Sequence, residues 1–443
     1  MEVLLSITYI CFFLFLINRL RFFKTTSLPF WLLGGIFILK LASGILMTLI
    51  YTYYYTDRST ADIFRYFDDS QVLYQSFFTN PLDGFRMLIG YHSEASDLKI
   101  YYDQMNSWYR EFSLNNDNRS MIRLNTLFRF FSMNFFYVHV VFMAFLSMSG
   151  LTAIYKLFNA QIKDRRYELF CIVFVLPSVL FWGSGVLKDS LMLFALGFLL
   201  HYLYRLFFEE ISIKSILCIC FFSFLLIMAR AYIMAAIFPG MLAWLWIAKT
   251  EKRPWIKFFT VHGIYLFMVF NIHYVMPHGY YNALKLLAAR QRNFLELAEA
   301  SHAGSLLPIH PLLPSYSSLL HNLPEAFWNV LMRPYFFESL SPLILLAGIE
   351  NLLIFVGMVF CLFTIKRSRP VQPLFFLALG FVLICFSLTG LVTPVAGAIV
   401  RYKMPALPFL FLIFLLISDK NKQSKYLNVF LNLFKVSKNH TIV

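Results

Sequence analysis

Long apolar runs are the feature of this sequence that most restricts its fold. Hydrophobic residues make up 59% of the 443 residues and charged residues only 14%. A bilayer-spanning helix needs roughly 20 apolar residues, and about eleven runs approach that length. They lie near residues 3–17, 30–54, 131–155, 168–183, 187–207, 214–229, 231–248, 257–275, 343–365, 372–390 and 403–418. We therefore expect an all-α, polytopic transmembrane helical bundle over residues 1–418, followed by a basic, amphipathic tail over 419–443.

Basic residues cluster in every second connection between these runs, for example over residues 19–24, 156–166 and 249–257. Because positively charged connections stay in the cytoplasm, we expect the N-terminus outside and the C-terminus inside. This bias accounts for most of the net charge of +15, so a nucleic-acid partner is not expected. The six cysteines all lie in apolar runs, where they indicate neither a disulfide framework nor a thiolate metal site.

Two long polar segments, residues 56–130 and 276–342, fall on the expected outer face. Both are too long to serve only as connections in a compact membrane domain. The shorter unusual polar stretches fall on the same face. We therefore expect the functional residues on the outer side of the membrane.

The first outer segment carries three acids, Asp62, Asp68 and Asp69, just beyond the aromatic residues 51–55. On a helix, Asp62 and Asp69 lie two turns apart on one face. Carboxylates near the interface can act as a general base toward a sugar hydroxyl or bind a divalent cation. A divalent cation is the only cofactor that this segment suggests. The alternative is a solvated amphipathic helix that lies on the membrane.

A Gly-Ser-Gly break at residues 183–185 precedes Lys188 and Asp189, which open the next apolar run. The first turn of a helix presents free N–H groups and a dipole that favour an anion. Lys188 adds a cation there, and Asp189 can hold it in place. Both residues are therefore candidates for binding a phosphate. The alternative is a tight turn between two spans, with a lysine that extends to the interface.

Charged and aromatic residues at three further outer connections complete the set of candidates. They are Arg230, Tyr232, Arg333, Glu338, Arg401 and Lys403. Basic residues on the outer face run against the topology rule, so we expect them to bind an anion there. We expect candidates from all these connections to meet in one outward-facing pocket, with cations on a phosphate and carboxylates on a sugar. For Arg230 the alternative is that it only defines a short turn.

Two further observations concern unusual polar residues. Lys40 lies in the middle of the second apolar run, where we expect it to pair with an acid inside the bundle. The second outer segment carries His302, His310 and His321, whose spacing matches no metal-ligand motif. A metal site is therefore not expected in that segment.

Motifs in the outer connections resemble those of a known group of proteins. They are P-S-x-x-F-W-x-S-G-x-x-K-D over residues 177–189, R-P followed by an acid over 333–338, and R-Y-x-x-P-x-x-P over 401–408. With the acid-rich first outer segment, they resemble bacterial envelope-polysaccharide membrane proteins. These are the C-type glycosyltransferases that use lipid-phosphate sugars and the related O-antigen and exopolysaccharide polymerases. One departure is that two spans, not one, precede the acids here.

The resemblance implies roles for individual residues. In the C-type enzymes, one or two acids of the first outer loop serve as base or metal ligand, which points to the acids within residues 62–69. In the polymerases, outer-loop arginines handle the pyrophosphate-linked donor, which points to Arg230, Arg333 and Arg401. The resemblance also implies location in the bacterial inner membrane.

The sequence thus leads to three hypotheses. The first is an integral-membrane glycosyltransferase that acts at the outer face on polyprenyl-phosphate-linked sugars for cell-envelope polysaccharide or glycoconjugate synthesis. Its partners would be the lipid-linked sugar and membrane lipid. The second is a repeat-unit polymerase with an oligosaccharide donor and no metal, so metal dependence separates the two. The third is a transporter or flippase for a lipid-linked sugar, which requires polar residues lining a path through the bundle.

Overall fold

The fold of the chain is all-α, as the apolar runs predict. The structure, a computed structural model, describes residues 1–24, 26–109, 116–162, 164–250, 252–275, 282–338, 341–366 and 372–423. Within these residues the only β-type pairings are two isolated bridges, Leu306 with Val395 and Ile365 with Ser418. The expected amphipathic part of the tail, residues 426–436, lies outside the described residues.

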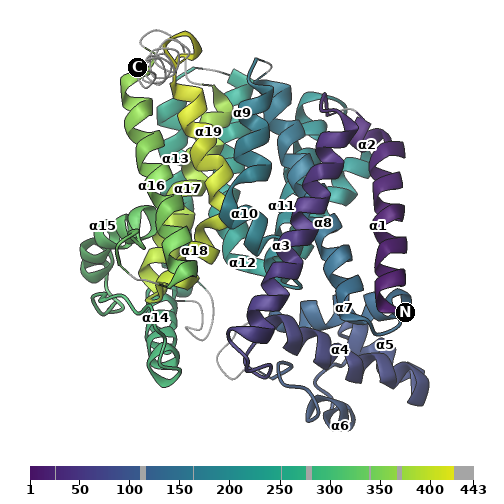
Figure 1. The fold of residues 1–443 in the computed structure, drawn as a ribbon. Helices are drawn as coiled ribbons and strands as arrows, with labels where there is room; N and C mark the ends of the chain where they lie inside the picture. Colours follow the sequence, from purple (N-terminus) through teal and green to yellow (C-terminus); the bar gives the residue numbers. More distant parts are fainter. Residues whose placement is uncertain are drawn as a thin grey trace, which may run out of the picture. The chain divides into compact units, whose positions relative to one another are not determined.

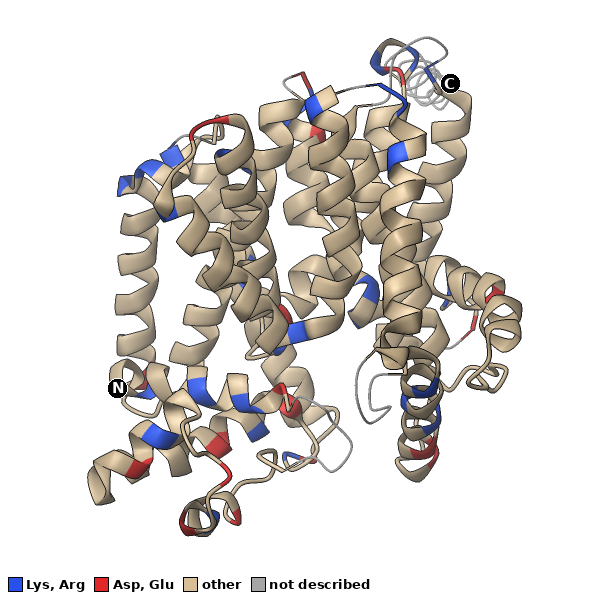
Figure 2. Cartoon of the chain, turned by 180° about the vertical axis from the view of Figure 1, so that it is seen from behind, with Lys and Arg blue, Asp and Glu red and all other residues tan. Residues whose placement is uncertain are grey.

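Nine helices in the described part of the chain are long and apolar enough to cross a membrane. They are α1 (Glu2–Arg19), α3 (Phe30–Tyr53), α8 (Phe136–Gln161), α11 (Lys188–Phe208), α12 (Ile213–Thr250), α13 (Pro254–Asn271), α16 (Pro342–Phe363), α17 (Pro373–Val392) and the run Ala396–Ile417, which contains α18 (Ala396–Lys403) and α19 (Leu407–Ile417). Charged residues gather toward helix ends and in the connecting segments (Figure 2). The chain is therefore a multi-pass membrane protein.

Two differences separate these nine helices from the eleven expected spans. The run near 168–183 is broken into α9 (Arg166–Phe170), a π-helical turn (Cys171–Val175) and α10 (Pro177–Trp182). Pro177 has no N–H for an intrahelical hydrogen bond, so a new helix starts there. The runs near 214–229 and 231–248 form the two helical stretches of α12, which meet at Arg230, where the backbone is not helical (φ −156°, ψ 82°). The number of spans stays a prediction.

The chain divides into two compact units, Met1–Met234 and Ala235–Val443. In the first unit α8 packs closely against α11. A β-carbon on Gly150 would overlap the backbone of Leu193, and one on Gly197 would overlap the carbonyl of Gly150. Glycine at both positions therefore lets the two backbones approach, as is common between helices in membranes.

The first outer segment forms four helices, α4 (Asp62–Thr79), α5 (Pro81–Ile89), α6 (Lys99–Tyr102) and α7 (Asn118–Ser132). Within the first unit they lie at the end opposite α2 (Arg21–Lys24) and α9 (Figure 1). The segment has its own apolar core, which includes Leu73, Met87 and Trp108. The three predicted acids therefore lie on a packed helix of a folded layer rather than on an isolated amphipathic helix.

In the second unit, α14 (Ala283–Ala300) and α15 (Tyr316–Met332) come from the second outer segment. Both pack against α17. An apolar core that includes Leu284 and Leu391 joins the three helices. A β-carbon on Gly390 of α17 would overlap the carbonyl of Ala326 of α15. Each unit thus combines apolar spans with a layer of shorter helices built from a long polar segment.

Candidate functional site

The acids predicted on α4 have different surroundings. Asp62 begins the helix and is half-buried. Asp68 forms a two-point ion pair with Arg58, with Nε to Oδ2 at 3.0 Å and Nη2 to Oδ1 at 2.6 Å. The Asp68 side chain remains 40% exposed. An exposed ion pair of this kind contributes little to stability.

Asp69 is buried and holds the loop that follows α6. Its Oδ1 accepts hydrogen bonds from the backbone N–H of Asn106 at 2.7 Å and from the Asn106 side chain at 3.1 Å, and its Oδ2 accepts one from the backbone N–H of Ser107 at 2.7 Å. Burial raises the pKa of the Asp69 carboxyl above its usual range, although these donors act in the opposite direction. Both carboxylate oxygens are thus engaged with the loop.

The Gly-Ser-Gly break positions the start of α11 by packing against α3. A β-carbon on Gly44 of α3 would lie 2.6 Å from the carbonyl oxygen of Ser184, and one on Gly185 would overlap the sulfur of Met47. Lys40 also lies here, with its Nζ 3.5 Å from the carbonyl oxygen of Val179 near the end of α10. The expectation that Lys40 pairs with an acid is therefore wrong, because its amino group donates to the Val179 backbone carbonyl instead.

Charged side chains from α7, α11 and α12 meet in the first unit. Lys188 of α11, 3% exposed, forms an ion pair with Asp117, which directly precedes α7 and makes no side-chain capping hydrogen bond. Arg230 places Nη2 at 3.4 Å from Asp189 Oδ1 and Nη1 at 4.0 Å from Asp117 Oδ2. Asp62 is close enough to Lys188 to stabilise its charge. We call these five residues the charged cluster.

The charged cluster is partly open to solvent at two carboxylates, those of Asp117 and of the half-buried Asp62. Asp117 is 27% exposed, whereas Asp189 is 1% exposed and Arg230 10%. The ring of Tyr66 forms another wall, with its centroid 5.5 Å from Lys188 Nζ, and its hydroxyl donates to Asn118 at 3.0 Å. Tyr232, half-buried, follows two residues after Arg230. Buried cations that share an exposed carboxylate can stabilise negative charge on a ligand bound there.

Sequence reasoning missed Asp117. It precedes α7 in a run of polar residues that resembles an ordinary helix start, and it is 71 residues from Lys188. The N-terminal position of Asp117 on a helix was the only local signal. Its pairing with Lys188 depends on tertiary structure.

The remaining candidates lie in the second unit. Lys403 is fully buried and donates to the carbonyl of Val330 at 2.8 Å and to Asn351 Oδ1 at 2.6 Å. Glu350 is also buried, and it lies close enough to Lys403 to stabilise the positive charge of the lysine.

An ion pair closes the R-P-x-x-x-E motif of the second unit. Arg333 Nε lies 2.9 Å from Glu338 Oε1, and Glu338 also accepts from the backbone N–H of Tyr335 at 3.0 Å. Arg401 lies half-buried on α18. Within the first unit the candidates gather around Asp117, and within the second unit Lys403 and the motif each have their own partners.

Comparison with known proteins adds no relative. The fold and the charged cluster together define a class, a multi-pass helical membrane protein with ionic side chains gathered beside a folded layer of shorter helices. No protein-family model matches the chain, and neither a curated protein nor a solved structure matches it. No group of three histidine, cysteine or acidic side chains that could hold a metal ion is present among the residues that the structure describes. The resemblance to polysaccharide enzymes stays a hypothesis.

Proposed function

We propose that this protein is an integral-membrane glycosyltransferase that acts at the outer face on a polyprenyl-phosphate-linked sugar. The observation that carries the proposal is the convergence of the buried Lys188 and the half-buried Arg230, from different helices, on the part-exposed carboxylate of Asp117. A lipid-linked donor needs a cationic site for its phosphate and a carboxylate near the reacting sugar. In the first unit, Lys188 and Arg230 are the cations that could contact the phosphate, and Asp117 is the carboxylate next to them.

In the proposed reaction, Lys188 and Arg230 bind the donor phosphate, and Asp117 accepts the proton of an acceptor hydroxyl. The hydroxyl oxygen attacks the anomeric carbon as the bond from that carbon to the phosphate oxygen breaks. The sugar is thereby transferred, and polyprenyl phosphate leaves with the bonding electrons. The two cations stabilise the negative charge that develops on the phosphate.

The acids on α4 support this arrangement in different ways. Asp62 lies near enough to Lys188 to favour its charged form, whereas the ion pair that holds the lysine is the one with Asp117. Asp69 shapes the loop through Asn106 and Ser107. Asp68 is engaged with Arg58. The proposal therefore moves the role of general base from the predicted acids to Asp117.

The test uses the purified full chain in lipid nanodiscs with a radiolabelled polyprenyl-phosphate sugar and a panel of saccharide acceptors. We expect Asp117→Asn to lower the rate of transfer by about 10²- to 10⁴-fold, the range for a general base. The matched control is Asp103→Asn, which changes an exposed acid of the same outer layer and should leave the rate unchanged.

Equal rates for wild type and Asp117→Asn would refute the assigned base, and no transfer by the wild type would refute the proposed reaction. A parallel assay with a chelator measures whether a divalent cation takes part. Loss of transfer on chelation, restored by added Mg²⁺, favours the C-type transferase over the metal-free polymerase.

A further inference from the structure

A cavity of about 340 Å³ lies in the first unit and contains no residue of the charged cluster. Its walls come from α1, α3, α4, the loop before α4 and the start of α8. Polar groups of Glu2, Thr52, Arg58 and Asn134 share the lining with aromatic rings such as Phe136. Its volume is near the lower end for ligand pockets, roughly 300–1,000 Å³, which suits a small headgroup.

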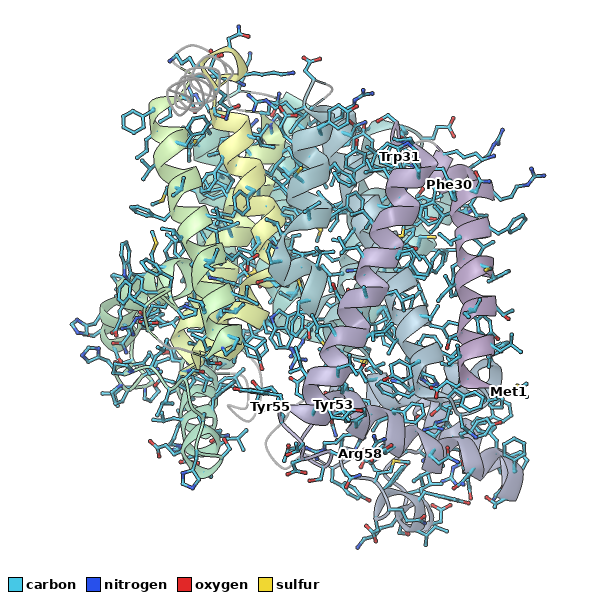
Figure 3. All side chains as sticks on the ribbon, in the orientation of Figure 1. Met1, Phe30, Trp31, Tyr53, Tyr55 and Arg58 are labelled. Carbon is cyan, nitrogen blue, oxygen red and sulfur yellow. The ribbon has the colours of Figure 1, made fainter. Side chains whose placement is uncertain are left out.

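The cavity lies at the level of the membrane–water interface. Tyr53, Tyr54 and Tyr55 at the end of α3 are exposed and form an aromatic belt. Figure 3 shows Met1, Tyr53, Tyr55 and Arg58 toward one end of the first unit, opposite Phe30 and Trp31. Only 6% of the apolar window of α1 is buried inside the protein, which leaves the rest to lipid. Phospholipid headgroups are therefore the neighbours of this cavity.

Arg58 offers a fixed cation to the cavity. Its Nε and Nη2 are held by Asp68, and its guanidinium lies over the ring of Phe64, 4.2 Å from the centroid. Among the described residues no acceptor lies within hydrogen-bond distance of Nη1. A guanidinium that is held in this way presents N–H donors suited to a phosphate oxygen.

Glu2 offers a carboxylate to the same cavity. Its Oε1 accepts the backbone N–H of Tyr137 at 3.0 Å, at the N-terminus of α8. Within the described ranges Oε2 has no hydrogen-bond partner. The rings of Phe135 and Phe136 also line the cavity. A carboxylate oxygen beside aromatic rings is a favourable site for an ammonium group.

The charges around the cavity favour a zwitterion. Asp68 pairs with Arg58, whereas Glu2, whose carboxylate accepts from the Tyr137 backbone, forms no ion pair within the described residues. An anionic headgroup would bring a second negative charge near Glu2, and an uncharged sugar would offer Glu2 no cation and the remaining Arg58 donors no charged acceptor. A headgroup with one phosphate and one ammonium group satisfies both.

We propose that this cavity binds the phosphoethanolamine headgroup of a membrane phospholipid. The phosphate binds Arg58, and the ammonium group donates to Glu2 and lies against the aromatic rings. The site goes beyond the proposed glycosyl transfer and does not depend on it.

The test is native mass spectrometry of the delipidated full chain, titrated with phosphatidylethanolamine or with phosphatidylglycerol of the same acyl chains. We expect the wild type to bind the first phosphatidylethanolamine about tenfold more tightly, the effect of one charge-assisted hydrogen bond. Glu2→Gln keeps an acceptor for Tyr137 and removes the charge. This variant should lose the preference while it binds phosphatidylglycerol at least as well as the wild type does.

The matched control is Glu209→Gln, which removes an exposed carboxylate of the same unit that does not line the cavity. It should keep the preference for phosphatidylethanolamine. Thermal unfolding of each variant in the same detergent checks the fold. Equal binding of the two lipids by the wild type, an unchanged preference in Glu2→Gln, or the same loss in Glu209→Gln would overturn the proposal.

Discussion

Lys188 in the first unit and Lys403 in the second are both buried lysines at the end of a helix, yet their partners differ. Lys188 pairs with a carboxylate that remains 27% exposed. Lys403 donates to a carbonyl and to the Asn351 side chain, and the nearby acid, Glu350, is itself buried. One lysine is therefore next to a route for a ligand, and the other is enclosed.

The difference shows that a charge in the wrong place for topology does not by itself mark a binding site. What distinguishes the two lysines is the exposure of the partner, because a ligand can compete only for a partner that solvent reaches. The resulting expectation is that changes at Lys188 affect activity, whereas changes at Lys403 affect stability.

The largest expected effect is on the enclosed lysine. Lys403→Met removes the buried cation near Glu350 and takes the donor away from the Val330 carbonyl and Asn351 Oδ1, which should cost about 3–5 kcal/mol of unfolding free energy. Thermal or denaturant unfolding in detergent measures this. The double variant Lys403→Met/Glu350→Gln should recover part of the loss, and a single variant as stable as the wild type would contradict the assigned role.

The next largest effect is expected at Lys188, whose ion-pair partner Asp117 is partly exposed. Lys188→Gln should lower glycosyl transfer by about 10²- to 10³-fold, the cost of removing one group that stabilises transition-state charge. The rate per folded protein is the measurement, with folded fraction taken from size-exclusion chromatography. Full activity in Lys188→Gln, or an equal loss of specific activity in Lys403→Met, would remove the contrast between the two lysines.

A smaller effect should follow from moving the turn that carries Lys188. In Gly44→Ala the new methyl group would lie 2.6 Å from the Ser184 carbonyl oxygen, so α3 and the turn must separate. Overpacking of this kind costs about 1–3 kcal/mol. The control is Gly35→Ala on the same helix, where the methyl group meets open space. If both variants unfold at the same temperature, close packing does not position the turn.

The smallest effect concerns the exposed ion pair on α4. Asp68→Asn should change the unfolding free energy by only about 0.2–1 kcal/mol, the range for exposed pairs. It should also leave transfer nearly unchanged, because Asp68 is engaged with Arg58 outside the charged cluster. A loss of transfer as large as that in Asp117→Asn would instead return Asp68 to the catalytic role that the sequence suggested.

The fold could be predicted from the sequence because apolar runs of bilayer length permit little besides helices. The turn before Lys188 also followed from local patterns, whereas a helix over the acids at 62–69 was considered only as a condition and the structure extends it to residue 79. The break at Pro177 was missed because the run on both sides of the proline is apolar, and average hydrophobicity carries no information on a missing N–H.

The site was predictable only in part. Lys188, Asp189 and Arg230 were identified because charges are costly at the ends of spans. Asp117 was not, since its importance comes from contact with residues far along the chain. Likewise, Asp62 and Asp69 are the same residue type and look equivalent in the sequence. Only the structure shows that backbone N–H groups of the loop already donate to the Asp69 carboxylate.

The partner of Lys40 has a consequence for how the protein is made. Helix α3 carries this lysine in its middle, and the Val179 carbonyl that accepts from it is synthesised 139 residues later. A lysine at the centre of a lone inserting helix costs roughly 2.5–3.5 kcal/mol. Insertion of α3 into the bilayer is therefore less favourable for the isolated helix than for α3 packed beside α10. Full stabilisation of α3 in the membrane must wait until α10 has been synthesised.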